Sequence, residues 1–170
     1  MEIPVITFAA YSGVGKTTYL EKLLSRLKAH GLRAAVIKHD GHDFQMDRPG
    51  TDTCRLAEAG ADTVAIVSGR RFALLEQQSL TVEEIVSRIT DVDLILTEGF
   101  KHGPYPKIAL YRMASGKPLA LDANDCLAIV TDKPMDAGCP VFPLNDPEPL
   151  ATYLISTLDL KKENGNVDNG

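Results

Sequence analysis

The segment AAYSGVGKTTYLEKLLSRLKAHG, residues 9–31, constrains the fold more than any other part of the chain. In it, a short apolar run leads through a glycine-containing loop into a helix with leucines at positions i, i+3, i+4 and i+7, which are Leu20, Leu23, Leu24 and Leu27. Charged residues occupy the opposite face, and Gly31 provides a stop signal. A buried strand followed by such a loop and an amphipathic helix is typical of the first unit of a parallel α/β sheet.

The loop SGVGKTT matches the pattern G-x-x-x-x-G-K-[ST] except at its first position, where Ala10 replaces glycine. Glycines can take positive φ, so the backbone N–H groups of the loop can converge on a phosphate. We expect Lys16 to reach the β and γ phosphates and Thr17 to place its hydroxyl on Mg²⁺. Alanine is tolerable at position 10 if its φ stays negative. The loop therefore favours nucleotide binding over a simple strand-to-helix turn, through Ser12, Gly13, Val14, Gly15, Lys16, Thr17 and Thr18.

Four apolar runs alternate with helical patterns along the chain: ITFAA (6–10), AAVIK (34–38), TVAIVS (63–68) and VDLILTE (92–98). This alternation predicts a mainly parallel sheet covered by helices, an α/β three-layer sandwich of the P-loop NTPase type. Because the runs are almost wholly apolar, we expect strands buried on both faces. A capping-box spacing from Thr81 to Glu84 predicts a crossover helix there. A last helix should begin after Asp146, with Pro147 in its first turn.

The length of 170 residues favours one domain over residues 1–160, and the polar ending KKENGNVDNG (161–170) is predicted to be a disordered tail. The net charge of -5 gives no reason for binding nucleic acid or an anionic membrane. No run approaches the roughly 20 apolar residues of a membrane span, and no basic leader precedes IPVITFAA, so we expect a cytoplasmic protein. Cys54, Cys126 and Cys139 fit neither a disulfide framework nor a zinc ribbon, and we expect idle thiols.

Acidic and histidine side chains follow two of the predicted strands. Glu98 ends VDLILTE, where a carboxylate could support Mg²⁺ together with Thr17; the alternative is a surface glutamate. Asp93 should lie at the opposite edge of the sheet. The segment 38–53 should emerge at the carboxyl edge, where it could border the γ-phosphate and Mg²⁺, contact a second phosphorylated ligand or form a solvated loop. Its spacing fits no zinc pattern. The candidate ligands in this histidine loop are His39, Asp40, His42, Asp43, Asp47 and Asp52.

Recognition of the base is less determined by the sequence. Asp132 in AIVTDKP follows a late strand and could accept from the N–H edge of guanine, although N-K-x-D spacing is absent. Thr-Asp-Lys-Pro is equally good turn chemistry. Basic residues in later loops could contact phosphates, but none receives an individual role: Arg70, Arg71, Lys101, Lys107 and Arg112. No residue is identified that would orient a water or stabilise developing charge, so no catalytic residue is predicted.

Taken together, AAYSGVGKTT, IKHDGHDF, RPGTDT, AGADTVAIVS and LTEGFKHGPYPKIALYR resemble the molybdopterin-guanine dinucleotide biosynthesis protein B (MobB) family. The resemblance implies a GTP- and Mg²⁺-binding homodimer of the P-loop fold with weak GTP hydrolysis. It also implies an accessory role, in which the protein assists the guanylyltransferase MobA in converting molybdopterin to its guanine dinucleotide form and could contact molybdopterin. By the same resemblance, residues 12–18 bind phosphates, Thr17 and Glu98 serve Mg²⁺, and the histidine loop borders the nucleotide.

Three other functions remain compatible with the motifs. A nickel-type metallochaperone GTPase shares a P-loop and histidine-bearing loops, but the sequence has no Cys-Pro-His-type cluster and no histidine-rich tail. An ATP-dependent small-molecule kinase would share the loop and prefer adenine nucleotides. A pure binding module would hold GTP, with molybdopterin or the partner, without useful turnover.

Overall fold

The structure is a computed structural model in which residues 2–160 are described, and they divide into two compact units. The first unit comprises the chain up to His39 and from Val86 onward, and the second comprises Asp40–Ile85. The prediction of a single domain over 1–160 stays a prediction, because a division by contacts does not show whether the units fold independently. The tail predicted at 161–170 lies outside the described residues.

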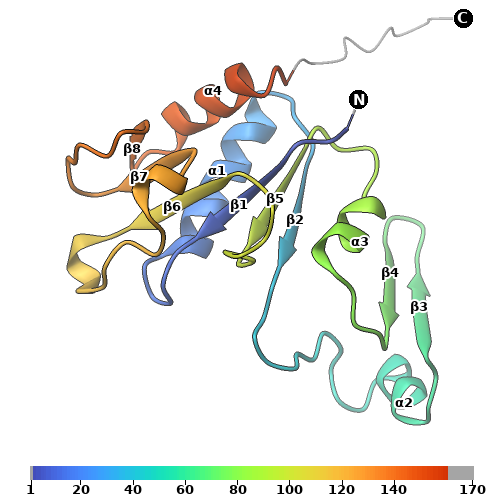
Figure 1. Cartoon of the computed structure of the whole chain (residues 1–170). Coiled ribbons are helices and arrows are strands. Elements are labelled where there is room, and N and C mark those ends of the chain that lie inside the picture. The colour runs from blue at the N-terminus through green and yellow to red at the C-terminus, as the bar shows by residue number, and fades with distance from the viewer. Residues whose placement is uncertain (1, 161–170) are drawn as a thin grey trace, which may run out of the picture. The chain divides into compact units, whose positions relative to one another are not determined.

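A six-stranded sheet forms the centre of the first unit, in the order β2-β5-β1-β6-β7-β8 (Figure 1). Each of its strand pairs is parallel, which confirms the predicted α/β fold with a mainly parallel sheet. Because β1 lies between β5 and β6, the loop that follows β1 emerges near the middle of the sheet. The strands are β1 (Val5–Ala9), β2 (Ala34–Lys38), β5 (Leu94–Glu98), β6 (Lys107–Tyr111), β7 (Ala128–Thr131) and β8 (Val141–Pro143).

Helices α1 (Lys16–Ala29) and α4 (Glu148–Thr157) contact each other and contribute to one core cluster on the sheet. Ile6 and Phe8 of β1 join this cluster, whereas Thr7 between them faces the opposite side because side chains alternate along a strand. Thr7 is nevertheless fully buried and shares a 2.9 Å hydrogen bond with Thr97 of β5. Burial on both faces is thus confirmed for β1, whereas β2 is an edge strand whose Val36 is 44% exposed.

The face of the sheet that carries Thr7 is packed near β7 against loop segments. There Ala109, Cys126 and Ile129 form a second apolar cluster, with Leu119 and Leu121 packed against it. Two short 3-10 turns flank this region: η1 (Met113–Ser115) and η2 (Ala123–Asp125). The chain leaving β6 therefore returns over the sheet before it enters β7.

The predicted helix ends agree with the structure. Gly31 has φ 81° just after α1, as a stop signal requires. Pro147 is the residue before α4, where its missing N–H has no cost. In α3 (Val82–Ser87), Glu84 N donates to Thr81 Oγ1 (3.2 Å) and Thr81 N donates to a Glu84 carboxylate oxygen (2.8 Å), so the capping box is formed. Helix α3 lies in the connection from β2 to its parallel neighbour β5, as expected of a crossover.

The second unit contains α2 (Asp52–Glu58) and an antiparallel hairpin of β3 (Thr63–Val67) and β4 (Phe72–Glu76). The prediction that TVAIVS adds a buried strand to the parallel sheet was therefore wrong. The reason is the turn that follows it: Ser68 N donates to Arg71 O (2.8 Å), and the apolar chain reverses at once into FALLE. Two β-prone runs joined by such a short turn pair with each other instead of entering a crossover.

Tyr19 of α1 provides a test of the core. It is 2% exposed, and its hydroxyl has no hydrogen-bond partner among residues 2–160. Burial, and secondarily the charge of Asp146, raise the pKa of this phenol well above its usual range. A buried hydroxyl without a partner costs about 1–3 kcal/mol in desolvation.

We therefore expect Tyr19→Phe to keep or increase the free energy of unfolding, measured by urea denaturation. Tyr153→Phe, at a half-buried site, is the matched control, and a loss above about 1 kcal/mol in Tyr19→Phe would show that the hydroxyl has a partner.

Candidate functional site

The glycine-containing loop joins the end of β1 at Ala9 to the start of α1 at Lys16. Gly13 has φ 82° and Gly15 has φ 99°, the left-handed conformations that the sequence predicts for these glycines. Ala10 is not among the residues with positive φ, so the replacement of the first glycine causes no backbone strain. Val14, between the two glycines, is only 2% exposed and anchors the loop in the core.

The start of α1 is suited to an anion. The N–H groups in the first turn of a helix have no partners within the helix. In α1 the preceding residue is Gly15, which has no side chain that could accept from them. No acidic residue occurs in this turn. The partial positive charge at this end of the helix therefore remains for an external anion. Ser12 lies in the loop and Thr18 in the first turn of α1, and both are exposed.

Glu98 reaches the same place from β5. Register pairs Phe8 of β1 with Glu98 of β5, so both strands end at the carboxyl edge of the sheet. The Thr17 hydroxyl donates to Glu98 Oε1 at 3.1 Å, and Lys16 Nζ lies 3.8 Å from that oxygen. The Lys16 and Glu98 side chains are 18% and 12% exposed. The structure thus brings the predicted hydroxyl, ammonium and carboxylate together. The two oxygen-bearing groups suit Mg²⁺, and the ammonium suits a neighbouring phosphate. Asp93 lies at the opposite edge and accepts from Arg33 N (2.6 Å).

A tight turn after Glu98 positions His39. The His39 N–H donates to Glu98 O (2.8 Å), and the imidazole packs edge-on against Phe100 with ring centroids 4.6 Å apart. Gly99 has φ 101°, and a Cβ there would lie 2.9 Å from the His39 Cβ. Only glycine therefore permits this approach. His39 is therefore held at the carboxyl edge of the sheet through the backbone of Glu98 and the ring of Phe100.

The remaining candidates of the histidine loop belong to the second unit. Four of them border an open cavity of about 1130 Å³ within that unit: Asp40, His42, Asp43 and Asp47. The hydroxyls of Thr53 and Thr51 hold the pKa of Asp47 below its usual range. Asp52 forms an exposed ion pair with Arg55 at 3.7 Å. Within residues 2–160, no three His, Cys, Asp or Glu side chains are grouped as a metal site would require.

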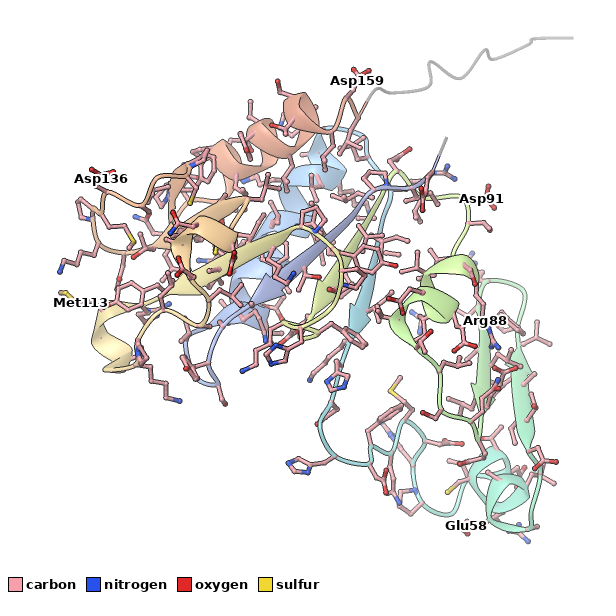
Figure 2. All side chains as sticks on the ribbon, in the orientation of Figure 1. Glu58, Arg88, Asp91, Met113, Asp136 and Asp159 are labelled. Carbon is pink, nitrogen blue, oxygen red and sulfur yellow. The ribbon has the colours of Figure 1, made fainter. Side chains whose placement is uncertain are left out.

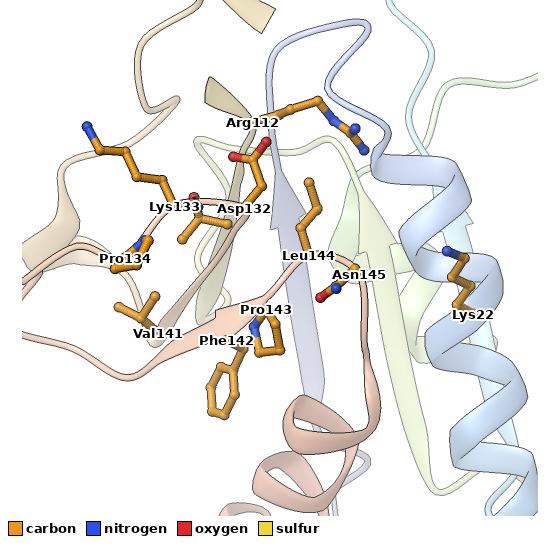
Figure 3. A pocket seen from close by; sticks show the side chains of 11 residues that line it. Lys22, Arg112, Asp132, Lys133, Pro134, Val141, Phe142, Pro143, Leu144 and Asn145 are labelled. Atoms are coloured by element: carbon orange, nitrogen blue, oxygen red, sulfur yellow. Dashed lines mark hydrogen bonds between the residues drawn. The ribbon is translucent and has the colours of Figure 1, made fainter. Parts of the chain in front are cut away.

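Asp132 lies beside a pocket of about 610 Å³ at the carboxyl edge of β7 and β8 (Figure 3). Its Oδ1 accepts from the backbone N–H of Met113 (2.9 Å), and Lys133 N donates to Thr131 Oγ1 (3.1 Å). The turn chemistry predicted for this segment is therefore present. Asp132 also faces the pocket, so its placement suits base recognition as well.

Two cations that contact the loop received no role from the sequence. Arg112 Nε donates to Val14 O (2.9 Å), and Lys117 Nζ donates to Ser12 O (2.7 Å). Arg112 follows β6, the parallel neighbour of β1, and recognition of KIALY as a strand would have placed it at this edge. By contrast, Lys107 Nζ donates to the nearby Tyr105 O (3.2 Å). Arg70 and Arg71 lie in the hairpin turn, and Lys101 is exposed.

The three cysteines are free thiols, with Cys126 buried and Cys54 and Cys139 partly exposed. Burial, with a smaller effect of Cys139, raises the pKa of Cys126 to about 11. Burial is also the main cause that raises the pKa of Cys54 and Cys139. Because thiolates are the nucleophiles and metal ligands, these pKa shifts disfavour reactivity at neutral pH. Among the described residues, no helix has the length and apolar character needed to cross a membrane.

Comparison with known proteins identifies the family. The family described as molybdopterin guanine dinucleotide synthesis protein B, MobB, matches residues 5–132. A molybdopterin-guanine dinucleotide biosynthesis adapter protein of Escherichia coli is 38% identical, with 96% of this chain and 97% of the relative covered. One of Haemophilus influenzae is 35% identical over 90% of this chain and 88% of the relative. The crystal structure of Bacillus subtilis MobB aligns with a TM-score of 0.73 at 28% identity, covering 95% of this chain and all of that chain. The chain belongs to the MobB family.

Proposed function

We propose that this protein binds GTP with Mg²⁺ at the phosphate loop and serves as an accessory protein in molybdopterin guanine dinucleotide formation. The observation that carries the nucleotide-binding part is the contact of Thr17 with Glu98 at 3.1 Å, directly beside Lys16 and the start of α1. A hydroxyl, a carboxylate and an ammonium group converge there on a loop with two left-handed glycines. This combination is the one that phosphate and Mg²⁺ require.

The free energy that nucleotide binding requires indicates that several groups of the site act together. Micromolar binding requires about 8 kcal/mol, whereas a helix dipole contributes only about 0.3–1 kcal/mol. The Lys16 ammonium, several loop N–H groups and Mg²⁺ held through Thr17 and Glu98 must supply the remainder. In this proposal, Thr17 and Glu98 would hold a metal ion that would neutralise phosphate charge, and the protein's own groups would hold and orient the nucleotide.

Selection of guanine over adenine is assigned to Asp132. Its Oδ1 accepts from Met113 N, and the carboxylate faces the open pocket beside Arg112 and Lys133. A carboxylate can accept from the N–H edge of guanine but finds no matching pair of donors on adenine. Oδ2, for which the described residues show no hydrogen bond, is the oxygen that would accept from the base.

The accessory role follows the names of the relatives, which are biosynthesis adapter proteins. In our proposal the protein works in the cytoplasm and assists a guanylyltransferase of the MobA type. Molybdopterin is a further candidate ligand, and His39, which follows β2 at the carboxyl edge of the sheet, would border the nucleotide. We assign no residue the role of orienting an attacking water, and the proposed turnover is therefore limited to a weak GTP hydrolysis.

Homodimer formation is proposed on the properties of the hairpin. Each of its strands has a single hydrogen-bonded neighbour, which leaves an open edge on both sides. Large apolar side chains are exposed along it, with exposed fractions of 57%, 76%, 67% and 46% for Ile66, Val67, Phe72 and Leu74. A solvent-exposed two-stranded hairpin is only marginally stable, so pairing with a second copy would stabilise it.

The nucleotide proposal predicts the outcome of calorimetric titrations with Mg²⁺ present. GTP should bind wild-type protein at micromolar concentration and more tightly than ATP. Lys16→Ala should abolish binding of both, whereas Lys28→Ala, an exposed cation in the last turn of the same helix, should bind as wild type does. Asp132→Asn should reduce the preference for GTP by about 10-fold or more, since one hydrogen bond to a charged group is lost.

The kinase and metallochaperone alternatives predict different outcomes. Preference for ATP would favour a kinase, and absence of binding by either nucleotide would contradict the site itself. Stoichiometric tight binding of Ni²⁺ in equilibrium dialysis would favour a metallochaperone.

The dimer proposal predicts a mass of twice 18.4 kDa in light scattering at micromolar concentration. Phe72→Glu should yield monomers, because a charge would be buried in the apolar interface. Met135→Glu, at an exposed apolar side chain in the first unit, is the matched control and should remain dimeric. A monomeric wild-type protein would contradict the proposal.

A further inference from the structure

Two cations that follow β6 in the chain, Arg112 and Lys117, donate hydrogen bonds to carbonyl groups of the phosphate loop. We propose that they are positioning residues that direct the amides of this loop toward bound phosphate. The inference rests on the proposed function of the loop as a nucleotide site. Arg112 Nε donates to Val14 O at 2.9 Å, and Lys117 Nζ donates to Ser12 O at 2.7 Å. Both contacts join parts of the chain about a hundred residues apart.

Because of the geometry of the peptide bond, each of these contacts also determines where the next N–H group in the chain points. A trans peptide is planar, so its carbonyl and the following N–H point in opposite directions, and the described residues contain no cis peptide bond. When Lys117 holds the carbonyl of Ser12, the N–H of Gly13 must point away from the lysine. When Arg112 holds the carbonyl of Val14, the N–H of Gly15 must point away from the guanidinium. The two cations therefore direct the amides of both loop glycines.

These glycines are the residues that most need such control. Gly13 and Gly15 lie at φ 82° and 99°, and glycine also samples many other conformations when nothing restrains it. A free loop would lose this conformational freedom on binding phosphate, which reduces affinity. Charge-assisted hydrogen bonds to the carbonyls already restrict the loop before phosphate binds. The loss of conformational entropy on binding is therefore smaller.

The Arg112 side chain lies directly against the loop. Figure 3 shows it extending from the end of β6 toward the turn that precedes α1. A Cβ added at Gly15 would lie 3.1 Å from a terminal guanidinium nitrogen of Arg112. Glycine at this position thus serves two purposes, since it permits the positive φ and leaves room for the guanidinium.

The segment that carries the two cations, residues 112–117, is itself restrained. Met113 N donates to Asp132 Oδ1 (2.9 Å), and Ser115 Oγ donates to Arg112 O (2.6 Å). Lys117 N in turn donates to Ser115 Oγ (3.3 Å). The apolar side chain of Met113, labelled in Figure 2, is 56% exposed, so its backbone rather than its packing fixes this segment. Asp132 therefore supports the placement of Arg112 as well as facing the pocket.

The hydrogen-bond partners of Arg112 and Lys117 are unusual for surface cations. A surface arginine or lysine commonly forms an ion pair with a carboxylate, which contributes little to stability. Within residues 2–160, neither Arg112 nor Lys117 forms such a pair, and both donate to carbonyls of one short loop. Two independent cations on alternate carbonyls of the same loop indicate a function of the loop rather than surface solvation.

Backbone order in the nucleotide-free protein is the first test. Order parameters from ¹⁵N relaxation should be about 0.85 at Gly13 and Gly15 in wild type. Lys117→Ala should lower the value at Gly13, and Arg112→Ala the value at Gly15, toward about 0.6. Lys133→Ala is the matched control, because Lys133 lines the same pocket as Arg112 without contacting the loop. It should leave both values unchanged.

Affinity for phosphate is the second test, with magnesium pyrophosphate and magnesium GDP as probes in calorimetry. Arg112→Ala and Lys117→Ala should each weaken both ligands by about 10-fold or more, and by the same factor for both, because the cations act through the phosphate loop. Lys117→Arg should restore most of the affinity, which a general loss of packing would not explain. Lys28→Ala, at an exposed lysine in the last turn of α1, is the control for affinity and should bind both probes as wild type does.

The outcomes separate this inference from the proposed function. If wild type binds neither probe, the nucleotide proposal fails, and the order parameters alone decide the positioning role. Unchanged order and affinity in both alanine variants would overturn the inference. A loss for GDP but not for pyrophosphate would overturn it too, since it would assign Arg112 to the base or ribose. Should Arg112→Ala not fold, Arg112→Gln and Lys117→Ala carry the test.

Discussion

The parallel pairing of β1 with β5 is the interaction on which the rest of the site depends. It places Phe8 opposite Glu98, so the strand that leads into the glycine-containing loop ends beside the strand that carries the Glu98 carboxylate. The buried hydrogen bond between Thr7 and Thr97 fixes this register from the opposite face of the sheet. A slip of one residue would turn the Glu98 side chain to that other face and remove it from Thr17.

Patterns that are local in sequence predicted the corresponding structure well. The leucine spacing of α1 and the apolar run AAVIK, which matches β2 at both ends, needed no knowledge of the remaining chain. The hairpin was missed because TVAIVS is as apolar as a buried strand, and only the turn after it distinguishes the two structures. Strand β8 has only three residues, and β6, which is as long as β1, follows a proline-containing segment, so their runs carried little signal.

The candidate site shows the same division between local and long-range information. Residues 12–18 are contiguous, and a glycine pattern was enough to predict a phosphate-binding loop there. Glu98 could be placed because it ends a recognisable strand. Arg112 and Lys117 act on the loop from about a hundred residues away, and their contacts depend on the strand order, which the sequence did not predict. Asp132 combines a backbone contact with access to the pocket, so its two interpretations were not exclusive.

A crystal structure with a non-hydrolysable GTP analogue and Mg²⁺ would test the central claim most directly. Our account predicts a phosphate within hydrogen-bonding distance, about 2.7–3.2 Å, of the Gly13, Gly15 and Lys16 amides, with Mg²⁺ at the Thr17 hydroxyl. It also predicts the base in the pocket that Asp132 lines. Phosphates bound elsewhere on the chain, with this loop unoccupied, would contradict it.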